Sequence, residues 1–545
     1  MTPLIGINYP IMPKQDKEAG ALQKIEVYDT TLRDGSQGEQ VSFSLEDKLK
    51  LTRKLDEFGF DFIEGGWPGS NAKDEEFFRE VRKLDLARAR VAAFGSTRRN
   101  GVAPAQDENL NKLLSAETEI ITLFGKSWDL HVRNVLRISL EENLDLISDS
   151  IDFLRRRGRR VFFDAEHFFD GYRENPAYAL KCLAAADQGG AERLVLADTN
   201  GGSLPDQVRA AMAEVKKITR RPLGIHTHND SGLAVANSIT AVAEGAVQVQ
   251  GTLNGLGERC GNADLLVIVP ILQVKMNRPC LDPEKLARLT TLAHYTYEVA
   301  NLTPPNNQPF VGASAFAHKG GIHVDAIRKE PRSYEHLDPA LVGNERRILV
   351  SELSGGATIL FKAERYGINK KGPETRRILA ELARLEKAGY QFEAAEGSFQ
   401  LLVAEVLGKR PVFFQVQEFR VIVERKNGLI VSEASVKVKV GDRLEHTVAE
   451  GDGPVNALDA SLRKALLSFY PSLADLRLTD YKVRVLNPEA ATAAKVRVLI
   501  ESADREETWG TVGLSENIIE ASLQALADSI DYKLFKESAV SRHRP

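Results

Sequence analysis

The hydrophobic positions between residues 24 and 275 alternate between two periods. Eight short runs rich in β-branched and aromatic residues have the length of buried strands, and segments with an apolar face of helical period separate them. The runs are Ile25–Tyr28, Phe60–Glu64, Val91–Phe94, Glu119–Phe124, Arg160–Asp164, Arg193–Ala197, Pro222–His226 and Ala246–Gln250. Leu45–Phe58 is typical of the helical segments, with Ser44 as its predicted N-cap and Asp47 three residues later.

This alternation predicts an α/β fold. Eight strands, each followed by a helix within about 250 residues, are typical of a (β/α)8 TIM barrel. An open, doubly wound sheet is the alternative, but no G-x-G-x-x-G fingerprint follows the first run to support a dinucleotide site.

The pattern changes after about residue 275. Glu284–Asn301 and Pro373–Gly389 are predicted to be helices of a linker region, and from Val412 onwards the hydrophobic period becomes two. Two strand-rich units, each ended by a helix, indicate an internally repeated α+β domain. We therefore expect an N-terminal arm over 1–23, the barrel over 24–283, helical linker subdomains over 284–408 and a C-terminal α+β domain over 409–545.

Composition narrows the class of protein. A hydrophobic fraction of 43% and a charged fraction of 27% are typical of soluble globular proteins. A net charge of −4 creates no field that would attract nucleic acid or an anionic membrane, so neither is an expected partner. No apolar run approaches the roughly 18 residues of a transmembrane helix, and Met1–Lys14 lacks the pattern of a signal peptide, so we expect a cytoplasmic protein.

Polar clusters follow directly on most of the predicted strands. They are Asp29–Gln37, Glu64–Pro68, Asp164–Glu166, Asp198–Thr199, His226–His228 and Asn254–Asn262. In a TIM barrel the active site forms at the carboxyl ends of the strands. The clusters are therefore expected to meet on one rim.

His226 and His228 indicate a metal site. One residue separates them on a strand, so both imidazoles point to the same face. With the carboxylate of Asp34 and the amide of Asn262 they form a set that suits a divalent cation acting as a Lewis acid. Each piece has a purely structural alternative, because a strand histidine is usually a hydrogen-bonded core residue and Asp-Gly is a common turn.

Three motifs resemble those of a known family. D-T-T-L-R-D-G-S-Q (29–37), H-T-H-N-D (226–230) and G-L-G-E-R-C-G-N (255–262) resemble the signatures of the acyl-CoA-condensing metallolyase family of 2-isopropylmalate, homocitrate and citramalate synthases. Gly65–Asp74 resembles in particular the long citramalate synthases, although Ala72 stands where they usually carry proline. The resemblance extends over essentially the whole chain.

The resemblance implies an acyltransferase that condenses acetyl-CoA with a 2-oxo acid and hydrolyses the thioester. It assigns a divalent metal (Mn, Mg or Zn) to Asp34, His226 and His228, with Asn262 as a further ligand. It assigns substrate binding to Arg33, Gln37, Glu64 and Thr199, and catalysis to Arg33, Glu166, His323 and Tyr334. Arg33, always protonated, is the group expected to stabilise the alkoxide that forms from the ketone.

The base that deprotonates the acetyl thioester stays open at this level. Glu166 is similar to a family residue that contacts the oxo acid, and His323 and Tyr334 match a proposed acid/base pair. In relatives that pair belongs to a lobe that reaches over the neighbouring subunit's site. Without the resemblance, His323 could equally be a polar surface residue on a glycine-rich loop.

The substrate and the effector are finer expectations. The Gly65–Asp74 resemblance favours pyruvate, with 2-oxoisovalerate as the rival; a lyase running the reverse chemistry and a non-catalytic amino-acid sensor are less favoured. The tail resembles a regulatory domain that binds an end-product amino acid at a dimer interface. Isoleucine is the implied effector of a homodimer, leucine would fit the rival, and a dimerisation domain without ligand is the alternative.

Overall fold

The computed structural model describes residues 24–319, 321–348, 373–392, 394–426, 428–486, 494–505 and 507–541, and the predicted N-terminal arm lies outside them. The chain divides into two compact units. The first contains the residues up to Phe316 together with His336–Arg346, and the second contains Ala317–Glu335 and the residues from Arg347 onwards. Within the described ranges, every helix is too short or too polar to span a membrane.

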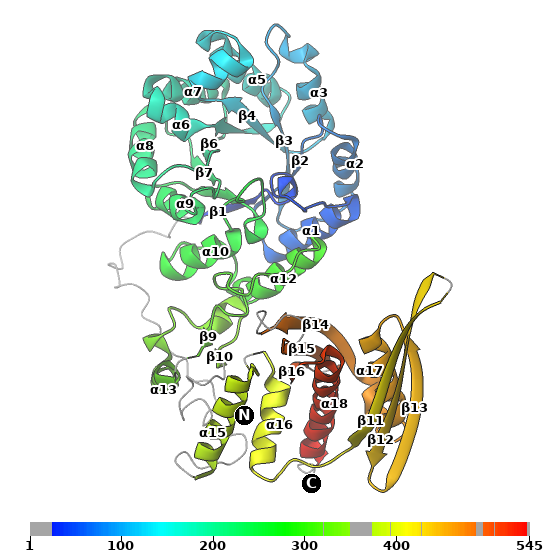
Figure 1. Cartoon of the computed structure of the whole chain (residues 1–545). Coiled ribbons are helices and arrows are strands. Elements are labelled where there is room, and N and C mark those ends of the chain that lie inside the picture. The colour runs from blue at the N-terminus through cyan, green and yellow to red at the C-terminus, as the bar shows by residue number, and fades with distance from the viewer. Residues whose placement is uncertain are drawn as a thin grey trace. The chain divides into compact units, whose positions relative to one another are not determined.

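The first unit is a closed barrel of eight parallel strands (Figure 1). The strands are β1 (Glu26–Asp29), β2 (Phe62–Gly66), β3 (Arg90–Ser96), β4 (Ile120–Lys126), β5 (Arg160–Glu166), β6 (Arg193–Asp198), β7 (Leu223–Thr227) and β8 (Gln248–Gly251). Each strand pairs with its neighbour in the sequence, and β8 pairs with β1 to close the barrel. The predicted TIM barrel and all eight predicted strands are confirmed.

Helices surround the barrel. They are α1 (Leu45–Phe58), α2 (Ala72–Val81), α3 (Glu108–Ser115), α4 (Asp129–His131), α5 (Leu140–Arg156), α6 (Phe168–Glu174), α7 (Pro176–Gly189), α8 (Pro205–Ile218), α9 (Ala234–Ala243) and α10 (Leu265–Pro270). α1 begins as predicted, because the Ser44 side chain accepts from the Asp47 backbone and the Asp47 side chain accepts from the Ser44 backbone.

The interior of the barrel is filled by side chains. Tyr28, Phe62, Ala92, Ile120 and Phe162 form a buried cluster, in which the rings of Phe62 and Phe162 meet edge to face at 5.3 Å between centroids. This cluster fills the middle of the barrel, and in a TIM barrel the active site forms at the carboxyl ends of the strands.

One predicted element after the barrel is wrong. The predicted helix Glu284–Asn301 is two helices, α11 (Pro283–Leu286) and α12 (Leu289–Val299), separated by a break at Arg288 with φ −115° and ψ 11°. Gly343, in the segment that returns to this unit, lies so close that a Cβ there would be 2.4 Å from the Ala287 carbonyl oxygen. The break is therefore a packing feature, which the local hydrophobic pattern does not record.

The second unit begins with β9 (Ala317–His318), which pairs with β10 (Arg347–Ile348), and contains α13 (Gly321–Lys329). α15 (Pro373–Ala388) matches the second predicted linker helix, whereas α16 (Glu396–Val406) was not predicted. Small 3-10 turns connect several of these elements.

Two α+β units follow, as predicted. The first has an antiparallel sheet of β11 (Gln415–Lys426), β12 (Leu429–Val440) and β13 (Arg443–Gly451), followed by α17 (Pro454–Leu466). The second has β14 (Arg477–Val485), β15 (Val496–Ala503) and β16 (Thr508–Ser515), followed by α18 (Ile518–Ser541). Ala434, Val436 and Val438 of β12 are buried in one core with Leu458 and Leu462 of α17.

Candidate active site

The loop after β1 is tied to the loop after β8. The Asp29 side chain accepts from the Thr31 backbone and hydroxyl at 3.0 and 2.8 Å, and the Thr31 hydroxyl oxygen accepts from the Leu253 backbone at 2.8 Å. The Asp34 backbone donates to the Thr30 carbonyl at 2.8 Å. Closure of the barrel therefore brings Asp34 beside residues more than 200 positions later.

His226 lies in β7 and His228 follows the strand directly. The backbone of His228 forms an isolated bridge with Asn262, which places the loop after β8 against the end of β7. A Cβ on Gly257 would be 2.5 Å from Asn262 Oδ1, so a residue without a side chain is needed to leave room for this amide.

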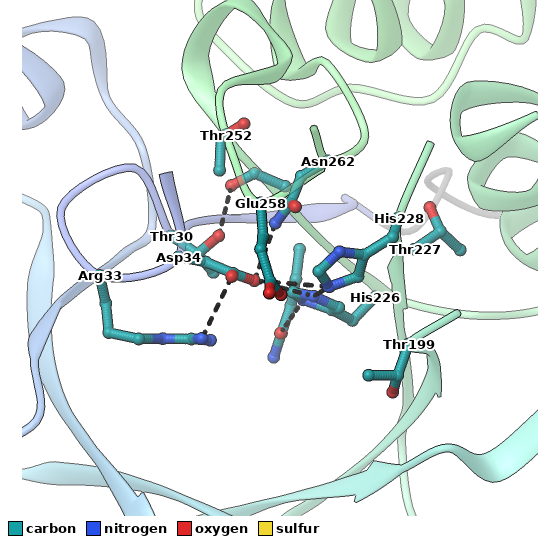
Figure 2. Close-up of polar contacts among 12 residues, drawn as sticks. Thr30, Arg33, Asp34, Thr199, His226, Thr227, His228, Thr252, Glu258 and Asn262 are labelled. Atoms are coloured by element: carbon teal, nitrogen blue, oxygen red, sulfur yellow. Dashed lines mark hydrogen bonds and ion pairs between the residues drawn. The ribbon is translucent and has the colours of Figure 1, made fainter. Parts of the chain in front are cut away.

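Asp34, His226 and His228 converge on one point (Figure 2). Asp34 Oδ2 lies 3.2 Å from His226 Nε2 and 3.7 Å from His228 Nε2, and the two imidazole nitrogens are 3.2 Å apart. All three residues are buried, and their candidate ligand atoms lie within 4.8 Å of one another. The loop after β1 thus supplies Asp34, and the end of β7 supplies the two histidines.

The electrostatics of this cluster suit a cation. Burial alone would raise the pKa of Asp34, but Arg33 and the two imidazoles lower it well below its usual range. Burial and the neighbouring His226 lower the pKa of His228 to about 3. Burial opposes protonation of His226 as well, but its hydrogen bond to Asp34 raises the pKa overall. The site therefore holds the anionic carboxylate of Asp34, the neutral imidazole of His228 and the imidazole of His226, whose positively charged form Asp34 stabilises.

Asn262 provides an independent test of whether a metal fits. Its amide nitrogen donates to Asp34 Oδ2 at 2.8 Å. Its Oδ1 is buried and has no hydrogen-bond partner among the described residues. Buried amide oxygens are normally satisfied, so an unpartnered amide oxygen on a residue that contacts Asp34 fits a divalent cation with mixed N and O ligands.

Arg33 is held beside the cluster by two carboxylates and a ring. Its Nε donates to Glu64 Oε2 at 2.6 Å, its Nη1 lies 3.4 Å from Asp34 Oδ1, and its guanidinium carbon lies 3.8 Å from the centre of the Phe94 ring. Glu64 also accepts from the Tyr28 hydroxyl at 2.8 Å. A guanidinium fixed in this way is a preorganised positive charge next to the candidate metal position.

Other predicted residues lie at the same ends of the strands. Glu166, the last residue of β5, forms an ion pair with Lys126, the last residue of β4. The Thr199 hydroxyl oxygen accepts from the His167 backbone at 2.8 Å, so its own proton is free to point to a ligand. Gln37 is exposed at the end of the 3-10 turn that follows Asp34.

His323 and Tyr334 belong to the second unit. Their rings stack with centroids 4.2 Å apart and an interplanar angle of 29°. His323 is exposed and Tyr334 is 45% exposed. The structure thus brings these two residues to each other, while the metal-site residues gather in the first unit.

Several residues around the site were missed in the sequence. Phe94 and Phe124 stack at 5.2 Å, and Trp67 meets both edge to face, forming an aromatic wall beside Arg33. Phe94 and Phe124 lie in strands and fit the pattern of an ordinary core, so nothing marked them, whereas Trp67 belongs to the predicted polar cluster Glu64–Pro68. Arg259 lies 3.3 Å from His228 Nδ1 and pairs with Asp230. Arg259 lies inside the G-L-G-E-R-C-G-N motif, so this motif could have identified it as a site residue from the sequence.

Three family descriptions match consecutive parts of the chain. The HMGL-like family matches residues 24–293, the homocitrate synthase post-HMGL domain-like family matches 310–389, and the LeuA allosteric (dimerisation) domain matches 393–534.

Several relatives are similar to this chain over nearly its whole length. An (R)-citramalate synthase of Geobacter sulfurreducens is 55% identical over 95% of this chain and 98% of its own length. An (R)-citramalate synthase of Aquifex aeolicus is 51% identical over 94% and 98%. A 2-isopropylmalate synthase of Methanocaldococcus jannaschii is 31% identical over 94% and 95%. The chain therefore belongs to the (R)-citramalate synthase family, which confirms the predicted resemblance and the prediction that it is an enzyme.

Proposed function

We propose that this protein condenses acetyl-CoA with pyruvate and hydrolyses the thioester, giving (R)-citramalate and free CoA. The observation that carries the proposal is the buried cluster of Asp34, His226 and His228 beside a fixed Arg33, in a chain that is 55% identical to an (R)-citramalate synthase over nearly its whole length.

In this proposal Asp34, His226 and His228 hold a divalent cation (Mn, Mg or Zn), with Asn262 Oδ1 as a further ligand. Such a cation would make the ketone carbon of a chelating 2-oxo acid electrophilic. The lowered pKa values of Asp34 and His228 support the assignment, because ligands must be unprotonated to bind metal.

Arg33 acts where charge develops. A base removes a proton from the acetyl methyl group, the resulting carbon bonds to the ketone carbon, and the ketone oxygen takes the electron pair as an alkoxide. Arg33 stabilises that oxygen, and Glu64 and Phe94 keep the guanidinium from moving. Water then attacks the thioester carbonyl, and CoA leaves as the thiol after protonation.

The remaining predicted residues bind and transfer protons. Thr199 donates its free hydroxyl proton to the oxo-acid carboxylate, and Gln37 and Glu64 complete the binding site. Glu166 orients the hydrolytic water, and the stacked pair His323 and Tyr334 provides acid/base groups from the second unit. The stacking supports the pairing of these two residues, because the Tyr334 ring fixes the orientation of the imidazole.

The choice of pyruvate over 2-oxoisovalerate has two supports. The aromatic wall of Trp67, Phe94 and Phe124 lies beside Arg33, and bulky rings near the oxo-acid side chain would favour a methyl group over a branched one. Identity is also higher to the (R)-citramalate synthase of Geobacter sulfurreducens than to the 2-isopropylmalate synthase of Methanocaldococcus jannaschii, 55% against 31%. A pocket of this kind discriminates by about 1–3 kcal/mol per methylene.

We further propose that residues 409–545 form a regulatory domain of a homodimer, and that isoleucine binds there and inhibits the enzyme. The match of residues 393–534 to an allosteric (dimerisation) domain supports this proposal. Residues 24–283 are then the catalytic barrel and 284–408 the linker between the two.

The test is release of free thiol by the purified full-length chain. It is supplied with acetyl-CoA and one of a panel of 2-oxo acids, with a chelator and then with Mn²⁺, Mg²⁺ or Zn²⁺ restored. Release with pyruvate that stops on chelation and returns with a metal is expected. Strongest release with 2-oxoisovalerate would favour the 2-isopropylmalate reaction, and no release with any oxo acid would remove the condensing function.

A further inference from the structure

Three buried polar side chains form a hydrogen-bonded line across the barrel. His226 Nδ1 of β7 lies 3.0 Å from Gln250 Oε1 of β8, and Gln250 Nε2 donates to Asp164 Oδ1 of β5 at 3.2 Å. His226 is 5% exposed, Gln250 0% and Asp164 6%. Because β5 and β8 are not neighbours, the second hydrogen bond crosses the barrel interior.

The direction of this line follows from what each group can do. An ionised carboxylate only accepts, so Gln250 must turn its NH2 group to Asp164 and its oxygen to His226. An amide oxygen also only accepts, so the proton of a neutral His226 lies on Nδ1. Once His226 is neutral, its Nε2 no longer donates to Asp34 and carries the lone pair, which is directed towards Asp34 and His228.

We propose that Asp164 and Gln250 are positioning residues that hold His226 in the Nδ1–H tautomer, so that Nε2 is available to the cation. The inference rests on the metal-dependent function proposed above. It goes beyond that function by giving two residues with no contact to the metal position a defined part in metal affinity. Partners that orient a metal-binding histidine typically change metal affinity by about 10–100-fold.

The same strand offers a matched comparison. Gln248 is two residues before Gln250 on β8, so its side chain points to the same face of the strand, and it is equally buried. Its amide donates to Glu26 at 3.2 Å, at the opposite end of the strands from the site. Gln248→Met and Gln250→Met therefore remove the same group from the same barrel core, and only the second variant breaks the line to His226.

The experiment measures Mn²⁺ binding by the full-length chain, freed of metal by chelation and dialysis, from the electron paramagnetic resonance signal of unbound Mn²⁺. Burial, and then the nearby Glu64, raise the pKa of Asp164 to about 7, so the measurement is made at pH 8, where the carboxylate predominates. We expect Gln250→Met to raise the Kd about 10–100-fold and Gln248→Met to change it less than about twofold. Circular dichroism in chelator shows whether each metal-free variant is folded.

A double variant distinguishes an effect of the His226 tautomer on metal affinity from an effect of core packing. Asp164→Asn combined with Gln250→Glu exchanges donor and acceptor along the line. The amide introduced at position 164 can donate to the carboxylate introduced at position 250, and that carboxylate still accepts from His226 Nδ1. We expect this variant to keep the wild-type Kd within about threefold.

Two results overturn the inference alone: equal weakening by the two methionine variants, or a folded double variant that binds Mn²⁺ as poorly as Gln250→Met. A wild-type chain that binds no Mn²⁺, and whose thiol release none of Mn²⁺, Mg²⁺ and Zn²⁺ restores after chelation, overturns the proposed metal-dependent function, and this inference with it.

Discussion

At the scale of single residues, the site is an arrangement of buried charges that depend on one another. Arg33 lies between Glu64, at 2.6 Å, and Asp34, at 3.4 Å, and both carboxylates are almost fully buried. Removing one charge from such a group leaves another without compensation, which costs more than the pair contributes. A substitution here therefore changes charge balance and geometry together.

Replacing Arg33 with lysine keeps the charge but loses the planar contact with Phe94 and the Nε bond to Glu64. We expect Arg33→Lys to lower kcat about 10²–10³-fold, as loss of an oxyanion-stabilising donor does, and to raise the KM for pyruvate less than tenfold. Steady-state thiol release measures both constants. Arg160→Lys, at the start of β5 and far from the carboxyl ends, is the matched control and should leave both unchanged. Equal losses in kcat and in pyruvate affinity would mean that Arg33 only binds substrate.

Asp34 is the one charged candidate ligand. Asp34→Asn keeps its shape but removes the charge that offsets a divalent cation, so we expect the Kd for Mn²⁺ to rise more than about 100-fold, beyond the usual effect of a residue that only orients a ligand. Titration calorimetry checks this. Glu39→Gln removes one negative charge from an exposed position in the same loop and should stay within about twofold of the wild type. Similar Kd values for Asp34→Asn and the wild type would exclude Asp34 as a ligand.

At the scale of elements, local signals determine most of what was predictable. α1 begins and ends where its pattern indicates, and the eight strands were found because each is a run rich in β-branched or aromatic residues, which in most cases leads into a polar cluster. The break before α12 and the aromatic wall were not predictable, since the first depends on Gly343 and the second is formed between strands. The convergence of Asp34 with His226 and His228 followed from the fold, whereas the hydrogen bonds of Gln250 and Asp164 depend on register across the barrel.

The start of α1 is itself a testable element. Ser44→Ala removes the N-cap acceptor and leaves the Asp47 backbone amide unpaired within the helix, which typically costs about 1 kcal/mol. We expect amide hydrogens in the first turn of α1 to exchange about fivefold faster, as mass spectrometry of the exchanged protein can measure. Ser42→Ala, at another exposed serine just before the helix, is the control. Equal exchange in the two variants would show that the cap does not stabilise this turn.

At the scale of the whole molecule, the proposed metal site and the proposed regulatory site belong to different units. The candidate metal ligands lie in the barrel, while the repeated α+β units lie in the second unit and share a buried core. A ligand of the second unit can therefore change the reaction only through a coupling free energy between the two sites.

Such coupling predicts a reciprocal pair of effects. Isoleucine should raise the apparent KM for acetyl-CoA or pyruvate, or lower kcat, and a typical coupling of about 1–3 kcal/mol corresponds to a change of about 5–150-fold in affinity. Where the effect is on substrate binding, saturating substrate must weaken isoleucine binding by the same factor. Thiol-release kinetics and calorimetry on the full-length chain measure the two factors, with leucine as the matched control because it has the same composition and a different branch point. Inhibition by leucine alone would assign the tail to the 2-isopropylmalate pathway, and binding of neither amino acid would leave the α+β units with dimerisation only.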